Sequence, residues 1–185
     1  MKTVEAIKDK QQILNMKKYL KSHSSRDYCL FLLGINTGIR IHTLLHTQVK
    51  DVLSDSGSVF HYLPSNSIDY PPIYLNEQVR NAIKQCIAVE NLQHNDYLFK
   101  SRKTTHPISR QQAYRIINDA ARDAGIEESI GTHTLRKTFG YHAFKKGIAI
   151  SLIQKRLQQC TSSETLHYLG LKKGKSTEIE LDVNL

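Results

Sequence analysis

The sequence has 185 residues, 39% of them hydrophobic and 23% charged, a balance that suits one folded domain and excludes a disordered chain. No segment has the roughly 18 consecutive apolar residues of a membrane helix, and three widely spaced cysteines exclude a disulfide framework, so we expect a cytoplasmic protein. The formal net charge of +9 is compatible with nucleic-acid binding or simply with a basic, solvated surface.

The first 50 residues predict helices. Apolar residues near 13–20 approximate helical spacing, and residues 24–38 predict a buried helix with Ser24 or Ser25 as its N-cap. Gly38 interrupts the pattern, and residues 39–49 predict a short third helix that carries Arg40 near its start.

The pattern then changes to short β-rich pieces, VKDVL, SVFHYL and PPIYL, separated by turn-rich segments, which predict a small antiparallel sheet. Helical patterning returns in five later segments: 76–90, 109–126 with Gly125 as a C-cap candidate, 132–147, 148–157 and 162–170. This order predicts an α+β fold that is mainly helical, with helices around one small antiparallel β-sheet. We expect one domain over 1–170, followed by a polar C-terminal tail over 171–185.

The positive charge is concentrated in two blocks. Residues 1–50 hold nine basic and three acidic side chains, and residues 100–156 hold twelve basic and four acidic ones, whereas the intervening segment is acidic. Clustered basic charge is typical of proteins that neutralise nucleic-acid phosphates. The candidate DNA contacts are Arg102, Lys103, Arg110 and Lys137.

Three short motifs stand far apart: TGIR, ending in Arg40; THTLRKTFGYH, with His133 and Arg136; and SSETLHYLG, with Tyr168. Together they resemble the tyrosine recombinase (phage integrase) family, whose catalytic domain has a TGxR helix start, an HxxR helix about ninety residues later and a tyrosine some thirty residues beyond it. The resemblance covers nearly the whole chain and is particularly close to the small bacterial integrases.

The resemblance implies a role for each residue. Arg40 and Arg136 would clamp the nonbridging oxygens of a scissile phosphate, because guanidinium forks hold two oxygens each without a metal. His133 lies one helical turn before Arg136 and would accept or orient a proton. Tyr168 would attack the phosphorus and form a 3′-phosphotyrosyl link that conserves bond energy for rejoining. We expect no cofactor and no metal; His42 and His46 have the i, i+4 spacing of a metal pair, but no third ligand is evident.

The sequence departs from the family pattern at three positions. A lysine that protonates the leaving 5′ oxygen is expected on the β-hairpin, but residues 51–79 contain no lysine and Asn66 is the best match. Asparagine cannot release a proton at useful pH, so general-acid catalysis would be lost or supplied elsewhere, with Lys137 as a possible source. Gln159 occupies a position usually held by His or Trp and would hydrogen-bond a phosphate oxygen, and Thr43 replaces an acidic residue.

The leading hypothesis is a site-specific DNA recombinase or integrase that cleaves and rejoins double-stranded DNA, associates with itself on DNA and is found at the nucleoid. One alternative is a noncatalytic or degenerate DNA-binding regulatory protein that keeps the integrase fold. A second is a type IB topoisomerase, for which the chain is compact. The resemblance implies a helical DNA-clamp domain ahead of the catalytic region, which this sequence does not include; we expect it to be either an excerpt of a longer protein or a minimal protein with a weakened grip on DNA.

Overall fold

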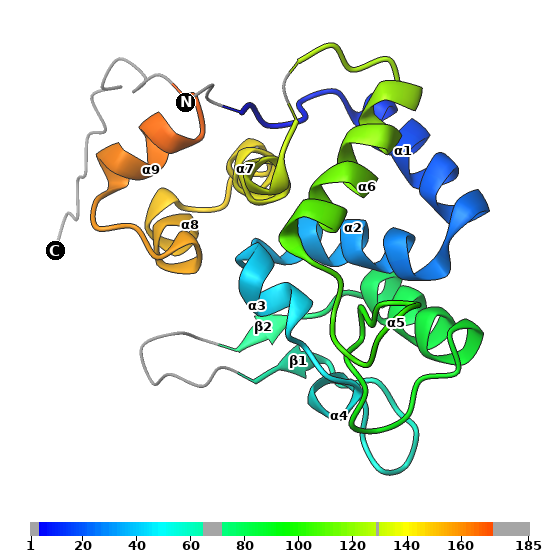
Figure 1. Cartoon of the computed structure of the whole chain (residues 1–185). Helices are drawn as coiled ribbons and strands as arrows, with labels where there is room; N and C mark the ends of the chain where they lie inside the picture. Colours follow the sequence, from blue (N-terminus) through cyan, green and yellow to red (C-terminus); the bar gives the residue numbers. More distant parts are fainter. Residues whose placement is uncertain (1–3, 65–71, 129, 172–185) are drawn as a thin grey trace, which may run out of the picture.

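A computed structural model describes residues 4–64, 72–128 and 130–171. These residues form helices around one two-stranded sheet (Figure 1). The helices are α1 Lys10–His23, α2 Ser25–Thr37, α3 Ile41–Leu45, α4 Val49–Val52, α5 Glu77–Val89, α6 Arg110–Asp123, α7 Thr132–Lys145, α8 Ile150–Leu157 and α9 Ser162–Tyr168, and the strands are β1 Tyr62–Leu63 and β2 Ile73–Tyr74. The predicted mainly helical α+β fold is confirmed.

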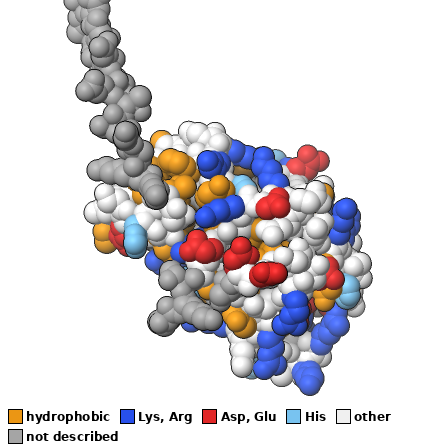
Figure 2. Space-filling view, turned by 90° about the horizontal axis from the view of Figure 1, so that it is seen from above, with side chains coloured by type: hydrophobic (Ala, Val, Ile, Leu, Met, Phe, Trp, Pro, Cys, Tyr) orange, Lys and Arg blue, Asp and Glu red, His pale blue; other side chains and the backbone are white. Residues whose placement is uncertain are grey.

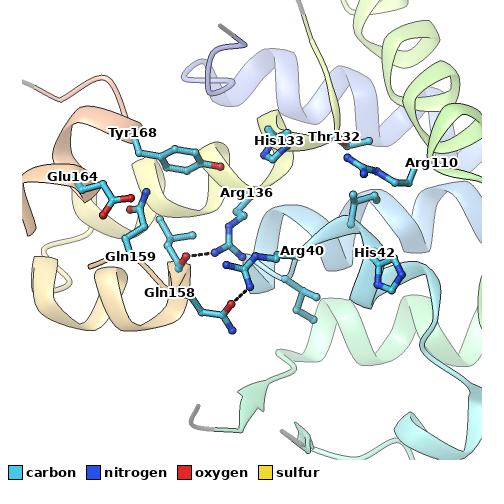
Figure 3. Close-up of a pocket in the computed structure, with 13 residues that line it drawn as sticks. Arg40, His42, Arg110, Thr132, His133, Arg136, Gln158, Gln159, Glu164 and Tyr168 are labelled. Atoms are coloured by element: carbon cyan, nitrogen blue, oxygen red, sulfur yellow. Dashed lines mark hydrogen bonds between the residues drawn. The ribbon is translucent and has the colours of Figure 1, made fainter. Parts of the chain in front are cut away.

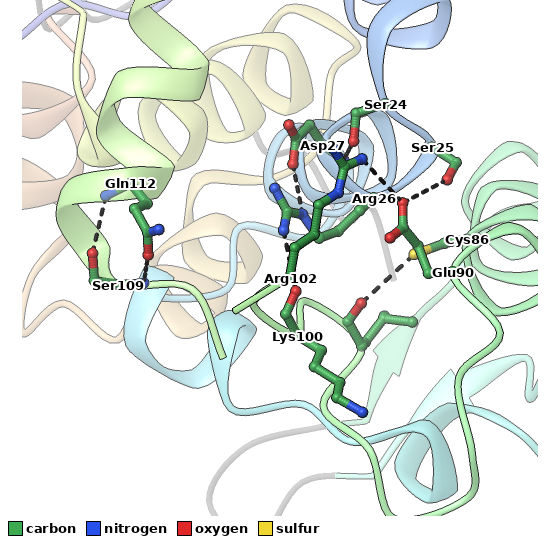
Figure 4. A network of polar contacts seen from close by, with 11 residues as sticks. Ser24, Ser25, Arg26, Asp27, Cys86, Glu90, Lys100, Arg102, Ser109 and Gln112 are labelled. Carbon is green, nitrogen blue, oxygen red and sulfur yellow. Dashed lines mark hydrogen bonds and ion pairs between the residues drawn. The ribbon is translucent and has the colours of Figure 1, made fainter. Parts of the chain in front are cut away.

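Side-chain caps set several helix starts. The Ser24 side chain accepts a hydrogen bond from the Asp27 amide at the start of α2, so the first of the two predicted N-caps is correct. Ser109 and Gln112 form a reciprocal capping box at the start of α6, visible in Figure 4. Gly125, just beyond the end of α6, has a φ of +72°, as expected of a C-terminal glycine.

Helix α2 is the centre of the core. It packs against α1, α5 and α7, and its residues 29–33 are fully buried. One apolar cluster joins α2 to α5, and a second joins α2 to α1 and α6. A third and smaller cluster ties α7 to α8 and α9 through Ala143, Ile153, Leu157 and Leu169. Helix α7 therefore connects the main core to the C-terminal helices.

The prediction of a strand over VKDVL is wrong, because this segment forms α4. The Asp51 carboxylate accepts a hydrogen bond from the Gln48 amide at 2.8 Å, and this cap stabilises a single helical turn in a segment of high β-propensity. The sheet is accordingly small: Tyr62 pairs with Tyr74, and Leu63 pairs with Ile73.

Two sequence predictions fall outside the described residues: the position of Asn66, and the tail apart from Leu171. Among the helices that are described, none combines the length and the apolar character required to cross a membrane.

Candidate active site

One cleft of about 420 Å³ gathers the five predicted catalytic residues. Arg40, His133, Arg136, Gln159 and Tyr168 all line it (Figure 3). They come from the start of α3, from α7, from the loop after α8 and from the end of α9. The remaining lining residues are Ile39, Ile41, His42, Arg110, Thr132, Leu157, Gln158 and Glu164.

The TGIR segment forms a tight corner between α2 and α3. Gly38 caps α2 in the left-handed conformation, with φ +66°, and a Cβ atom there would lie 2.5 Å from the Phe139 ring. Arg40 then takes the N-cap position of α3 and extends into the cleft. Only glycine combines this φ with this close approach, so the corner fixes where the Arg40 side chain begins.

Arg136 is buried and held by backbone carbonyl groups. It is 8% exposed, its Nη1 donates to the Gly38 carbonyl at 2.7 Å, and its Nη2 donates to the Leu157 carbonyl. Burial lowers the pKa of its guanidinium, and the charge of Arg40 acts in the same direction, while Tyr168 opposes the shift. The guanidinium remains charged because an arginine side chain is not deprotonated in proteins. The structure thus fixes a positive fork before any substrate binds.

We predict that Gly38→Ala destabilises the protein and disturbs Arg136. The substitution combines a left-handed alanine with a clash against Phe139, for an expected loss of about 2 kcal/mol or more, or roughly 5 °C in Tm. Gly57→Ala is a matched control, since Gly57 has φ +79° but nothing within 4 Å of its Cβ position. Equal melting temperatures for the two variants would contradict the packing argument.

His133 projects from the first turn of α7 into the cleft, one helical turn before Arg136. Partial burial lowers the pKa of its imidazole, and the charges of Arg110, Arg136 and Lys137 lower it further. A histidine with a lowered pKa stays neutral to more acidic pH than an ordinary histidine. His133 is therefore available as a proton acceptor at neutral pH.

Tyr168 ends α9 with its phenol directed toward Arg136 and His133 (Figure 3). Its hydroxyl group is buried and has no hydrogen-bond partner among the described residues. Burial raises the pKa of the phenol, while the charges of Arg136 and Arg40 oppose the rise. The phenol is thus protonated at rest, and its ionised form gains stability from two guanidinium groups.

The loop after α8 and the first turn of α9 contribute three polar side chains, of which sequence reasoning anticipated one. Gln159 enters the cleft, and its buried Oε1 atom has no partner among the described residues. Gln158 ends α8 in the left-handed conformation and accepts a hydrogen bond from Arg40 Nη1. Glu164 also lines the cleft, and its carboxylate accepts from the Cys160 amide at 2.9 Å. Gln158 lies outside the three motifs, and Glu164 lies within SSETLHYLG at a position to which the resemblance gives no role.

The four candidate DNA contacts do not lie together. Arg110 begins α6 and lines the cleft, whereas Arg102 lies 3.7 Å from Glu90 in the polar network of Figure 4, outside the cleft. Lys103 is exposed in the same loop as Arg102. Lys137 is only 6% exposed, which leaves little of it for a phosphate at the surface.

The two histidines considered as a metal pair stack on each other, with ring centroids 4.3 Å apart. His42 lines the cleft, while His46 meets the edge of Tyr97.

The chain is similar to known recombinases in sequence and in fold. The phage integrase family profile matches residues 7–175. The probable integrase/recombinase YoeC of Bacillus subtilis is 40% identical over 171 residues, which are 92% of each protein. Among solved structures, XerA recombinase superimposes with a TM-score of 0.76 at 21% identity, covering 93% of this chain and 61% of that one. A lambda integrase dimer bound to a COC′ core site superimposes with a TM-score of 0.67 at 16% identity, covering 98% of this chain and 65% of that one. The chain belongs to the phage integrase family of tyrosine recombinases.

Proposed function

We propose that this chain cleaves and rejoins double-stranded DNA as a site-specific recombinase, with Tyr168 as its nucleophile. The observation that carries the proposal is the cleft itself, which collects Arg40, His133, Arg136 and Tyr168 from three separate parts of the chain. A phenol beside two guanidiniums and a neutral imidazole is suited to phosphoryl transfer without a bound cofactor.

The reaction follows from these groups. Arg40 and Arg136 bind the nonbridging oxygens, where negative charge increases in the transition state. His133 accepts the phenol proton as the Tyr168 oxygen bonds to phosphorus, and the bond from phosphorus to the 5′ oxygen breaks. The 5′ oxygen takes a proton from water, so the products are a 3′-phosphotyrosyl link and a free 5′ hydroxyl, and the reverse attack by a 5′ hydroxyl restores the strand. Gln159 donates from its amide nitrogen to a phosphate oxygen.

The electrostatics of the cleft, more than the overall charge, support DNA as the substrate. Figure 2 shows a face on which lysine and arginine side chains lie in separate groups with acidic side chains between them. The cleft, in contrast, holds Arg40, Arg110 and Arg136 against one carboxylate, that of Glu164. We place the protein on chromosomal DNA at the nucleoid, and we propose that copies associate there, since the lambda integrase structure is a dimer on its core site.

DNA affinity should fall steeply with salt, with a log–log slope of about −0.9 for each phosphate neutralised. Arg110→Ala should make the slope shallower by about one unit, because Arg110 lines the cleft. Arg122→Ala is the control from the opposite end of the same helix, where Arg122 pairs with Asp119 at 3.6 Å. Fluorescence anisotropy with a labelled duplex measures both slopes, and a response that is flat in salt would remove DNA as the main partner.

A nicked suicide duplex tests the proposed activity. Cleavage next to the nick releases a short strand that diffuses away, so a recombinase accumulates as a covalent adduct, which a denaturing gel resolves. A protein that binds the duplex and forms no adduct would be the noncatalytic DNA-binding alternative. Efficient relaxation of supercoiled plasmid without recombination would instead indicate a topoisomerase.

A further inference from the structure

Lys137 is a buried cation that the proposed reaction does not yet use. It follows Arg136 on α7, is 6% exposed, and holds its Nζ atom 5.1 Å from the centroid of the Tyr168 ring. Among the ion pairs and side-chain hydrogen bonds of the described residues, none includes Lys137. An ammonium group is costly to bury without a partner, so the face of the Tyr168 ring is the main compensation that the structure provides.

The charged and titratable groups around Tyr168 are mostly cationic. The cleft that Tyr168 lines holds Arg40 at the start of α3, His42 on α3, Arg110 on α6, His133 and Arg136 on α7 and Glu164 on α9; Lys137 of α7 lies over the ring, and Arg156 of α8 acts on Arg136. Among these groups of the described residues, Lys137 alone lies over the face of the tyrosine ring. A phenolate carries more negative charge in its ring than a phenol does, so a cation on the ring face favours the ionised form.

The geometry of the displacement reaction indicates which of the two reacting oxygens Lys137 lies near. The attacking and leaving oxygens of a phosphoryl transfer lie roughly in line, on opposite sides of phosphorus. A group stacked on the nucleophile is therefore on the attacking side, away from the 5′ oxygen. This placement argues against Lys137 as the replacement for the hairpin lysine that the sequence lacks.

We propose that Lys137 is a positioning residue for the nucleophile: its ammonium holds the Tyr168 ring in the cleft and stabilises the negative charge that develops on the phenol oxygen as its proton leaves. The inference rests on the proposed function, since it requires Tyr168 to attack. In this step the phenol proton passes to His133, the new bond joins the tyrosine oxygen to phosphorus, and the 5′ oxygen departs with its electron pair and takes a proton from water.

The test compares Lys137→Met and Lys137→Arg with the native protein. Methionine keeps the length of the buried side chain and removes the charge, while arginine keeps a cation able to lie on the ring. Lys145→Met is the matched control, because Lys145 is on the same helix with its Nζ 5.9 Å from the Tyr141 ring, outside the cleft. Adduct formation is measured at saturating DNA from about pH 6 to about pH 9, on normal DNA and on DNA with a bridging 5′ phosphorothiolate, whose thiolate leaves without a proton.

We expect Lys137→Met to slow adduct formation by about tenfold or more, equally on both substrates and at every pH measured, because burial raises the phenol pKa above its ordinary value and the phenol stays protonated over this range in both proteins. Lys137→Arg should restore most of the rate, and DNA affinity should stay within about twofold. A deficit seen only on normal DNA would overturn the proposal and make Lys137 the proton donor to the leaving group. Failure of Lys137→Arg to restore the rate, together with a lower Tm in both variants, would make the role merely structural.

A second measurement does not depend on activity. The phenolate absorbance of Tyr168, obtained as the difference between each protein and its Tyr168→Phe counterpart, should begin at higher pH in Lys137→Met than in the native chain. An unchanged titration would overturn the proposal. If the native protein forms no adduct on either substrate, the proposed function fails, and the titration still decides whether Lys137 favours the phenolate.

Discussion

Replacing Arg136 with alanine is expected to slow adduct formation by about 10²- to 10³-fold, while DNA affinity changes far less. Arg136 supplies charge to a phosphate whose oxygens become more negative in the transition state, so its largest contribution comes during the reaction. Many other basic residues remain to bind the duplex in its ground state. Single-turnover rates on the nicked duplex at saturating protein, beside anisotropy measurements of affinity, separate the two effects.

A loss of stability is the main competing explanation for such a result, because Arg136 also binds the Gly38 and Leu157 carbonyls. Arg26→Ala is the matched control: the Arg26 side chain is 11% exposed and donates to the Lys100 carbonyl at 3.1 Å, outside the cleft (Figure 4). It should lower Tm but not the rate measured below the melting transition. Comparable rate losses in the two variants would contradict a catalytic role for Arg136.

Asn66→Lys is expected to accelerate cleavage of normal DNA by about 10²-fold or more while barely changing cleavage of the phosphorothiolate. The family places a proton donor for the 5′ oxygen in the segment between β1 and β2, where this chain has Asn66. The proposed nucleophile, phosphate clamp and base do not depend on this position, so the deficit should fall on the leaving group. The phosphorothiolate isolates this step because its thiolate departs unprotonated.

Asn66→Gln is the control, since glutamine lengthens the side chain without adding a proton to donate. If the native protein already cleaves both substrates at similar rates, another donor is present and the interpretation of an impaired enzyme is wrong. The same two substrates thus distinguish two roles: a lysine at position 66 would protonate the leaving group, whereas Lys137 acts on the nucleophile.

The sequence predicted the helices from local signals, and it predicted the five catalytic residues of the cleft from the resemblance of its motifs to the tyrosine recombinase family. Ser24 and Gly38 mark the ends of α2, and the HxxR spacing places His133 and Arg136 on one face of α7. The segment VKDVL was misassigned because the cap between Gln48 and Asp51 outweighs the β-propensity of its valines.

Contacts between segments that are distant in the sequence could not be predicted from the sequence. The hydrogen bond between Arg40 and Gln158 joins residues 118 positions apart, and the place of Lys137 against Tyr168 depends on how α9 packs on α7. Gly140 permits that packing, since a Cβ atom there would lie 2.5 Å from Leu169. Spacing in the sequence gave the distance from Arg136 to Tyr168 along the chain, but not which side of the ring a cation would occupy.

The central claim is that Tyr168 forms the bond to DNA, and mapping the adduct tests it most directly. The native protein is trapped on the nicked duplex, digested, and the peptide that carries the nucleotide is sequenced by mass spectrometry, with Tyr168→Phe and Tyr141→Phe treated in parallel. We predict that the nucleotide is attached to Tyr168. Tyr168→Phe should bind DNA with unchanged affinity and form no adduct, and Tyr141→Phe should form as much adduct as the native protein. Modification at any other tyrosine, or an undiminished adduct from Tyr168→Phe, would contradict the account.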